Sequence, residues 1–242
     1  MKKIKNIYKS KEFAEAWDKR LLEEDLLRTK VMYPVLFKNL NLKNKKVLDV
    51  GCGNGVMLPE LVKRGPSKVS AFDISKYLVG IARKRNPSVD FSIQDLTKSL
   101  KFRSNEFDVV FCFNVLMEFT NVANAIFELK RIVKRKGEIR LVLAHPLYNL
   151  FVNDPAVSKQ STAERLQRYR LNESFNVTTI PGYSDFKVYR RPISFYVNHF
   201  INAGLTIKHM QEIYVSKAVA KSREKYKKRL NFPMFLYFVL EK

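Results

Sequence analysis

The pattern of apolar and polar positions changes near residue 46. Before that point, apolar residues recur at helical spacing, at Phe13, Trp17, Leu21, Leu22, Leu26 and Leu27. Pro34 lies further along the same segment and is expected to break or restart the helix. From residue 46 onward, short apolar runs alternate with amphipathic segments. The pattern therefore predicts a helical segment over 1–45, followed by a unit of alternating strands and helices.

The alternating unit predicts five strands, over 45–50, 68–74, 89–96, 107–115 and 138–146. Helices are predicted over 55–65 and 121–137, and a further helix is expected to begin after Ser75, as its N-cap, and to end near Pro87. Continuous apolar strands separated by helices are typical of a parallel sheet covered on both faces. The predicted class is therefore α/β, doubly wound.

After residue 146 the regular alternation stops. Residues 147–191 are polar and irregular, and they are too long for a simple connection within a compact domain. We predict that they form a lid over a substrate. A helix over 193–205 and strands over 206–215 and 232–240 follow. The expected division is thus a helical cap at 1–45, a core at 46–146, a lid at 147–191, and a segment at 192–242 that completes the sheet.

Composition limits the classes to consider. The chain has 242 residues, 46% of them hydrophobic, which suits one folded α/β domain with an elaboration. No apolar run reaches the roughly 18 residues that a bilayer span needs, and the first residues lack the apolar region of a secretory signal. The 2 cysteines are too few for a disulfide framework or a four-thiolate metal site. We expect a cytoplasmic protein without a metal centre.

The charge is strongly positive. The chain has 45 Lys and Arg residues against 23 Asp and Glu residues, a formal net charge of +22, which attracts polyanions. Basic residues concentrate between 217 and 229 around a single acid, Glu224: they are Lys217, Lys221, Arg223, Lys225, Lys227, Lys228 and Arg229. This basic cluster has two interpretations, a solvated lysine-rich face or a surface that contacts RNA or an anionic membrane.

Three of the chain's 8 glycines lie within one short stretch, "KVLDVGCGNGV". Gly51, Gly53 and Gly55 follow an apolar strand directly, where a doubly wound sheet forms its binding crevice. A dinucleotide-binding turn would carry its third glycine at position 56, which is Val56 here. Asp49 lies two residues before the first glycine. A carboxylate there favours a ligand with an ammonium or sulfonium charge over a pyrophosphate.

Three more polar residues end neighbouring strands, so they should gather at the same edge of the sheet. Asp73 can accept hydrogen bonds from both hydroxyls of a ribose, and we expect its carboxylate to face a solvent-filled crevice. Asp95 can accept from an adenine amine, and Asn114 can offer its backbone carbonyl to an amino-acid head group. Together they predict a ligand made of a nucleoside attached to an amino acid.

The stretches "VLDVGCGNG", "AFDIS", "IQDL", "FDVVFCFNVLMEF" and "LKRIVKRKGEIRLVLAHP" resemble, in order and spacing, the successive motifs of the class I S-adenosylmethionine-dependent methyltransferases. The resemblance covers about residues 46–146, and "RRPISFYVNHFINAGL" is similar to a helix in the small-molecule branch of that family. One departure is the turn before the fifth strand, where Lys134, Arg135, Lys136 and Gly137 replace the usual Lys-Pro-Gly-Gly.

The resemblance implies a Rossmann-like methyltransferase fold with a mostly parallel seven-stranded sheet and S-adenosyl-L-methionine as cofactor. By position, it implies Asp49 and Gly51 near the methionine moiety, Asp73 on the ribose, Asp95 and Leu96 around adenine, and Asn114 near the amino-acid portion. Cys52, Gly53 and Ile74 complete the cofactor-binding set that we expect.

His145 follows the fifth strand, where an acceptor should approach. We consider it as a catalytic residue that orients or deprotonates the nucleophile, with a purely structural histidine as the alternative.

Three functions are compatible with these features. The first is methyl transfer to an oxygen or nitrogen of a small metabolite under the lid. The second is methylation of RNA, which the positive charge favours. The third is a cofactor-binding protein without activity, which the intact Asp49, Asp73 and glycines disfavour. The sequence specifies neither the acceptor nor the oligomeric state.

Overall fold

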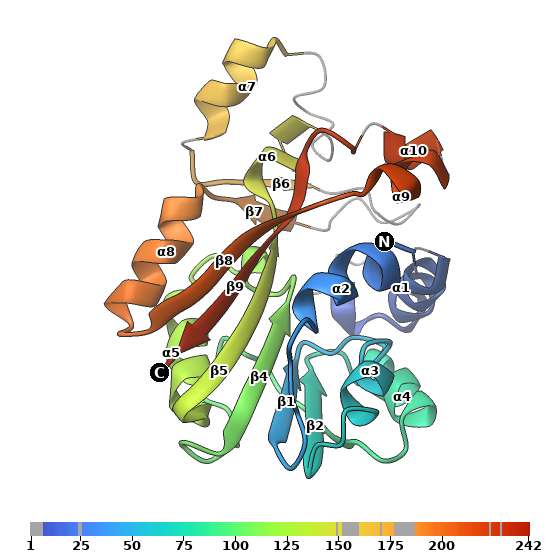
Figure 1. Cartoon of the computed structure of the whole chain (residues 1–242), viewed down its shortest axis with the longest axis vertical. Coiled ribbons are helices and arrows are strands. Elements are labelled where there is room, and N and C mark those ends of the chain that lie inside the picture. The colour runs from blue at the N-terminus through green and yellow to red at the C-terminus, as the bar shows by residue number, and fades with distance from the viewer. Residues whose placement is uncertain are drawn as a thin grey trace.

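Figure 1 presents the computed structural model of the chain. The residues that the structure describes are 7–23, 26–148, 150–151, 160–169, 171–176, 187–222, 224–227 and 229–242. Within them, no helix is both long enough and apolar enough to cross a bilayer.

Seven strands form one sheet in the order β3-β2-β1-β4-β5-β9-β8. Their bounds are Lys46–Val50 for β1, Lys68–Asp73 for β2, Asp90–Ile93 for β3, Phe107–Phe113 for β4, Val133–Ala144 for β5, Thr206–Tyr214 for β8 and Pro233–Glu241 for β9. Strands β1 to β5 pair in parallel, whereas β9 runs antiparallel to both of its neighbours. The predicted α/β class and the mostly parallel seven-stranded sheet are confirmed. The strand order reverses between β1 and β4, where such sheets bind ligands.

Alternating side chains of the central strands supply two apolar layers. Val47 of β1 packs into the layer that contains the N-terminal segment and α3 (Leu58–Val62), whereas Leu48 packs into the layer that contains α5 (Ala123–Ile132) and α8 (Ile193–Asn202). Figure 1 shows α5 and α8 on one side of the sheet, with α3 and the N-terminal helices on the other. The strands are therefore buried on both faces, which is why they read as continuous apolar runs.

Local signals set several helix boundaries. Helix α4 (Lys76–Arg85) begins after Ser75, whose side-chain Oγ accepts a hydrogen bond from the backbone nitrogen of Leu78 at 3.3 Å. The predicted N-cap is therefore confirmed, and the helix ends two residues before Pro87 as expected. Helix α3 is shorter than the predicted 55–65, because Gly55 adopts a φ of +73° that no helix interior accepts.

The prediction of a helix over 121–137 is wrong at its C-terminal end. Helix α5 ends at Ile132, and β5 begins at the next residue. Val133 is fully buried and pairs with Phe107, so its β-branched side chain enters the sheet instead of the helix. The strand register shifts between Phe107 and Val109, and Lys136 has a φ of +62°. The unusual Lys-Arg-Lys-Gly stretch is thus accommodated as an irregularity within a strand pair.

The N-terminal segment is helical in several pieces. These are η1 (Ile7–Lys9), α1 (Lys11–Glu23), the π-helical turn η2 (Leu27–Met32) and α2 (Tyr33–Leu36). Pro34 is the second residue of α2, where its missing N–H is tolerated. The predicted restart of the helix at Pro34 is confirmed.

The region from 147 to 191 contains regular structure that the sequence pattern did not reveal. It begins within α6 (Pro146–Tyr148) and includes α7 (Thr162–Tyr169) and a two-stranded antiparallel sheet of β6 (Glu173–Asn176) and β7 (Lys187–Arg190). Parts of the predicted lid, residues 149, 152–159, 170 and 177–186, lie outside the described residues. The basic cluster forms α9 (Lys217–Ser222) and α10 (Glu224–Lys227) between β8 and β9.

Candidate functional site

The glycine turn after β1 depends on two separate properties of glycine. Gly51 and Gly53 have φ values of +67° and +53°, in the left-handed region that other residues rarely adopt. A Cβ on Gly51 would lie 2.4 Å from Cγ2 of Val115, which follows β4. Glycine at 51 therefore permits both the bend and the close packing of the turn against the end of β4.

Asp73, at the end of β2, holds the turn in place. Its Oδ2 accepts a hydrogen bond from the backbone nitrogen of Gly53 at 2.9 Å, and its Oδ1 accepts from that of Ser75 at 2.9 Å. The residue is only 8% exposed, although it lines the cavity described below. Burial raises the pKa of Asp73, and hydrogen bonding from the backbone of Ser75, Gly53 and Ile74 partly opposes that rise. Each carboxylate oxygen has a second lone-pair direction, which can still accept from a ligand hydroxyl.

Asp49 and Asn114 lie at the ends of β1 and β4. Asp49 is 3% exposed, and burial, followed by the nearby charge of Asp73, raises the pKa of its carboxyl group. A positively charged ligand group would relieve both effects. Asn114 has a φ of +56°, and its side-chain Oδ1 is buried with no hydrogen-bond partner in the described part of the chain. A buried acceptor without a partner indicates a donor that a ligand supplies.

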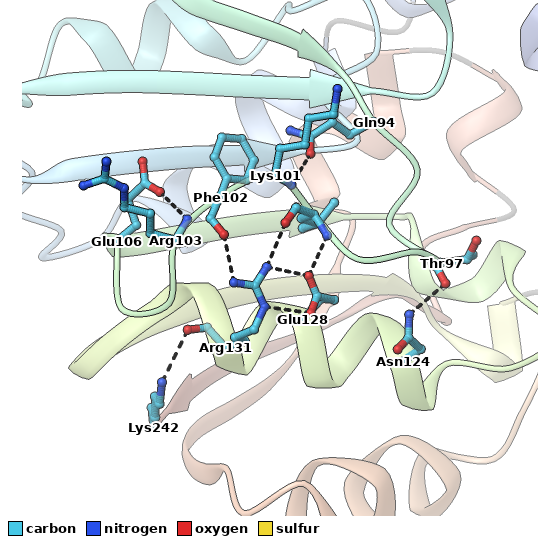
Figure 2. Close-up of polar contacts among 11 residues, drawn as sticks. Gln94, Thr97, Lys101, Phe102, Arg103, Glu106, Asn124, Glu128, Arg131 and Lys242 are labelled. Carbon is cyan, nitrogen blue, oxygen red and sulfur yellow. Dashed lines mark hydrogen bonds and ion pairs between the residues drawn. The ribbon is translucent and has the colours of Figure 1, made fainter.

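The loop after β3 carries Asp95 and Leu96 and is fastened to α5 (Figure 2). Glu128 of α5 accepts a hydrogen bond from the backbone nitrogen of Leu100 at 2.7 Å and forms an ion pair with Arg131 at 2.7 Å. Arg131 also donates to the carbonyl oxygen of Leu100 at 3.0 Å. This network fixes the loop that presents the two residues predicted to surround adenine.

A tyrosine and a glutamate meet across the cavity in a pairing that the sequence pattern did not indicate. Glu118 ends η3 (Leu116–Glu118), the short 3-10 helix after β4, and its Oε1 accepts a hydrogen bond from the hydroxyl of Tyr8 at 2.7 Å. Burial and the charge of Asp73 raise the pKa of Glu118 to about 8, against the opposing effect of the Tyr8 hydrogen bond. The pair connects the N-terminal segment to the end of β4.

Hydrogen bonds hold helix α1 against the glycine turn. The side-chain amide of Asn54 donates to Oδ1 of Asp18 at 2.6 Å, and Arg85 of α4 donates both to Asp18 at 3.0 Å and to the carbonyl oxygen of Asn54 at 2.7 Å. Trp17 lies beside the turn, with its Nε1 3.9 Å from where a Cβ on Gly53 would be. The N-terminal segment therefore covers the strand ends directly.

These elements enclose a cavity of about 740 Å³. All nine residues predicted to bind the cofactor line it: Asp49, Gly51, Cys52, Gly53, Asp73, Ile74, Asp95, Leu96 and Asn114. The rest of the wall includes Tyr8, Trp17, Tyr33, Glu118, Tyr148 and Arg229. The volume falls within the range of small-molecule sites, about 300 to 1,000 Å³.

His145 has a different environment from the one expected of a catalytic residue. It is 1% exposed and is not part of the cavity wall, although the preceding Ala144 is. Its Nδ1 accepts from the backbone nitrogen of Leu147 at 3.2 Å, so in the neutral ring the proton lies on Nε2, 3.1 Å from a carboxylate oxygen of Glu212. Burial lowers the pKa of His145 despite the opposing effect of Glu212. The contacts are those of the structural alternative.

The comparison with known families agrees with this geometry. Residues 48–141 match the family model described as "Methyltransferase domain". Residues 48–141 therefore form a methyltransferase domain of the class I S-adenosylmethionine-dependent type. The predicted family, enzyme class and cofactor are therefore confirmed. The match begins in β1 and ends in β5, so this methyltransferase domain contains the glycine turn and all four strand ends that carry the acids.

Similar proteins differ in what they act on. An uncharacterized protein from Haemophilus influenzae is 27% identical over 222 residues, 86% of this chain and 85% of that protein. A ubiquinone biosynthesis O-methyltransferase from Dechloromonas aromatica is 31% identical over 109 residues, covering 42% of this chain and 45% of that enzyme. A tRNA U34 carboxymethyltransferase from Sulfurimonas denitrificans is 26% identical over 150 residues, covering 58% and 50%. The chain thus spans about half the length of the two relatives with a named activity.

A solved S-adenosylmethionine-dependent methyltransferase from Mesorhizobium loti shares the fold, with a TM-score of 0.72 at 21% identity, covering 87% of this chain and 97% of that one.

The cavity fits the family's cofactor on chemical grounds. S-adenosylmethionine supplies an electrophilic methyl group on a positively charged sulfur. The buried carboxylates of Asp49 and Asp73 suit positive groups and ribose hydroxyls, and the buried Oδ1 of Asn114 lacks a donor among the described residues. The residues present are therefore able to hold it.

Proposed function

We propose that the chain transfers a methyl group from S-adenosylmethionine to an oxygen or nitrogen of a small metabolite, as in the small-molecule branch of the family. One observation carries this proposal: nine residues from four separate strand ends, all predicted from the sequence, line a single covered cavity. In this proposal Asp73 holds the ribose hydroxyls, Asp49 and Asn114 face the amino-acid portion, and Asp95 and Leu96 surround adenine.

The protein's contribution is binding, alignment and exclusion of water, because the sulfonium already makes the methyl group electrophilic. The N-terminal segment, η3 and β7 supply the cover. Arg191, which follows β7, donates to the carbonyl oxygens of Phe119 and Thr120 at 2.6 and 2.7 Å, so β7 is held next to η3. Residues 1–45 and 147–191 therefore act, in this proposal, as cap and lid over the core at 46–146.

Calorimetry tests the cofactor part of the proposal. We expect S-adenosylmethionine and its demethylated product, S-adenosylhomocysteine, to bind one site per chain, and NAD not to bind. Asp73→Asn should weaken binding about ten- to hundredfold, because charge-assisted hydrogen bonds to ligand hydroxyls each contribute roughly 1.5–3 kcal/mol. Unchanged affinity in a folded Asp73→Asn protein would remove Asp73 from the site.

Methylation of RNA is the second candidate. The net charge of +22 favours it, and so does the similarity to a tRNA-modifying enzyme over 58% of this chain. Incubation with labelled S-adenosylmethionine and separate pools of metabolites and RNA distinguishes the two, with salt dependence as a check on polyanion binding. We propose a cytoplasmic location for the protein under either function, which is compatible with the free thiols of Cys52 and Cys112.

A further inference from the structure

Arg229 joins the basic cluster to the cavity. It follows α10 and lines the cavity wall, whereas the other described side chains of the cluster, Lys217, Lys221 and Lys227, do not. Its guanidinium lies over two aromatic rings, 5.2 Å from the ring centre of Tyr226 and 5.8 Å from that of Tyr148. Both tyrosines are buried, at 0% and 5% exposure, so the aromatic support for the guanidinium is well packed.

The polar edge of this guanidinium is available to a ligand. Stacking on aromatic rings uses the faces of the planar group and leaves its five N–H donors around the rim. The backbone of Arg229 is hydrogen-bonded, but its half-buried side chain makes no hydrogen bond or ion pair with any residue that the structure describes. A cation withdrawn from water without a counter-charge favours an anion beside it. A planar guanidinium suits carboxylate and phosphate groups in particular.

The position of Arg229 separates it from the acidic part of the cavity. The carboxylates in the wall, Asp49, Asp73, Asp95 and Glu118, all lie at or just after the ends of β1 to β4. Arg229 instead comes with the α9–α10 segment, and α9 packs against η2 of the N-terminal cover. Figure 1 shows α9 and α10 beside the N-terminal helices. The cavity therefore presents acids at the strand ends and basic residues at the cover, where Arg20 and Arg28 of the N-terminal segment line it as well as Arg229.

We propose that Arg229 binds a carboxylate or phosphate group of the methyl acceptor, so that the substrate is a small anion. This inference rests on the proposed function, because it assigns the acidic strand ends to the cofactor and the remaining space to the acceptor. Lys187 of β7 also lines the cavity from the cover and adds positive charge to that side. The acceptor's negative group would then be held at the cover while its nucleophilic atom points toward the strand ends.

Binding of simple probes tests the proposal without turnover. The protein is saturated with S-adenosylhomocysteine, and two matched pairs are titrated by calorimetry: benzoate against benzyl alcohol, and phenyl phosphate against phenol. We expect an anion of at least one pair to bind about ten- to hundredfold more tightly than its neutral partner, as one charge-assisted contact allows. Comparing the two pairs distinguishes a carboxylate site from a phosphate site. Equal binding within both pairs would overturn the proposal.

Three variants show whether Arg229 carries this preference. Arg229→Met removes the charge and keeps a long side chain over the two rings, and it should abolish the preference. Arg229→Lys keeps the charge but loses the planar fork, and it should retain only part of the preference. Lys217→Met, an exposed residue of the same cluster outside the cavity wall, is the matched control and should behave as wild type. The melting temperature of each variant shows whether it is folded, and its affinity for S-adenosylhomocysteine is measured as well. A tenfold loss of that affinity in folded Arg229→Met would assign Arg229 to the cofactor instead of the acceptor.

A transfer assay separates failure of this inference from failure of the proposed function. A metabolite extract is divided by anion exchange, and both fractions and an RNA pool are tested with labelled S-adenosylmethionine. Methyl transfer confined to the anion-retained metabolites supports the proposal. Transfer confined to the unretained metabolites, or to RNA, overturns it. Selective anion binding that depends on Arg229, without transfer to any pool, keeps the anion site and refutes the methyl-transfer function.

Discussion

Two glycines with the same backbone conformation allow a controlled test of the turn after β1. Gly51 and Gly65 have φ values of +67° and +69°. A Cβ on Gly51 would lie 2.4 Å from Cγ2 of Val115, whereas a Cβ on Gly65 would meet nothing within 4 Å. The pair Gly51→Ala and Gly65→Ala therefore separates the cost of the left-handed conformation from the cost of the steric contact.

The expected magnitudes follow from these two contributions. A left-handed conformation costs a residue with a Cβ roughly 1–2 kcal/mol, and the stiffer unfolded chain offsets about 0.4–1 kcal/mol of that. Gly65→Ala should thus lower the free energy of unfolding by about 1 kcal/mol. Gly51→Ala adds an overpacking cost of about 1–3 kcal/mol, because the branched Val115 side chain packs against the apolar layer that contains α5 and α8, for a total of about 2–4 kcal/mol.

Urea unfolding of the ligand-free protein, followed by circular dichroism, measures both values. Gly80→Ala is a third variant: Gly80 lies in α4 with open space around it, so this change should stabilise the chain by about 0.5–1 kcal/mol. In a Val115→Ala background the cost of Gly51→Ala should approach that of Gly65→Ala, because the clashing Cγ2 is gone. Equal costs for the two glycines in the wild-type background would refute the steric argument.

Three further predictions concern the cavity wall. The pKa of Glu118 is raised from near 4.5 to about 8, so the folded chain keeps a proton that the unfolded chain releases between these two pH values. The stability of the ligand-free protein should therefore fall as the pH rises through this window. Glu118→Gln should flatten the slope of melting temperature against pH. Asp18→Asn should weaken calorimetric binding of S-adenosylhomocysteine at least about threefold by loosening α1, and unchanged affinity would remove α1 from the closed site. Arg131→Met leaves the buried Glu128 without its ion-pair partner and should lower the free energy of unfolding in urea by about 3–5 kcal/mol. The double variant Arg131→Met/Glu128→Gln should lower it by less, because no buried charge is then left unpaired. A larger loss in the double variant would contradict the role given to that ion pair.

Most of the fold could be predicted because its signals are local. Ser75 caps a helix through a contact three residues away, and the buried strands appear as uninterrupted apolar runs bounded by glycine, proline or asparagine. The nine residues predicted to bind the cofactor could be placed at one cavity for the same reason, since each lies at or near the end of a strand that the pattern already revealed.

The remaining features depend on contacts between distant parts of the chain. Tyr8 and Glu118 are 110 positions apart, and neither lies in a pattern that indicates a partner. Asp18 and Arg85 are separated by 67 positions. The end of α5 was misplaced because residues 133–137 continue a basic helix-like pattern, and pairing of Val133 with Phe107 overrides it. The position of His145 after β5 predicts a place near the acceptor, but it does not specify the direction of the side chain.

The position of β9 has a consequence for how the chain folds during synthesis. Strand β9 comes after β8 in the sequence, yet it lies between β5 and β8, and β8 reaches the sheet only through β9. Strands β1 to β5 can assemble while the ribosome is still translating, because they pair in parallel with one another and only β5 still lacks a partner, β9. The nascent chain must then hold β8 unpaired until residues 233–241 leave the exit tunnel. A chain truncated before residue 233 and released from the ribosome should therefore contain a protease-resistant core with an unprotected β8.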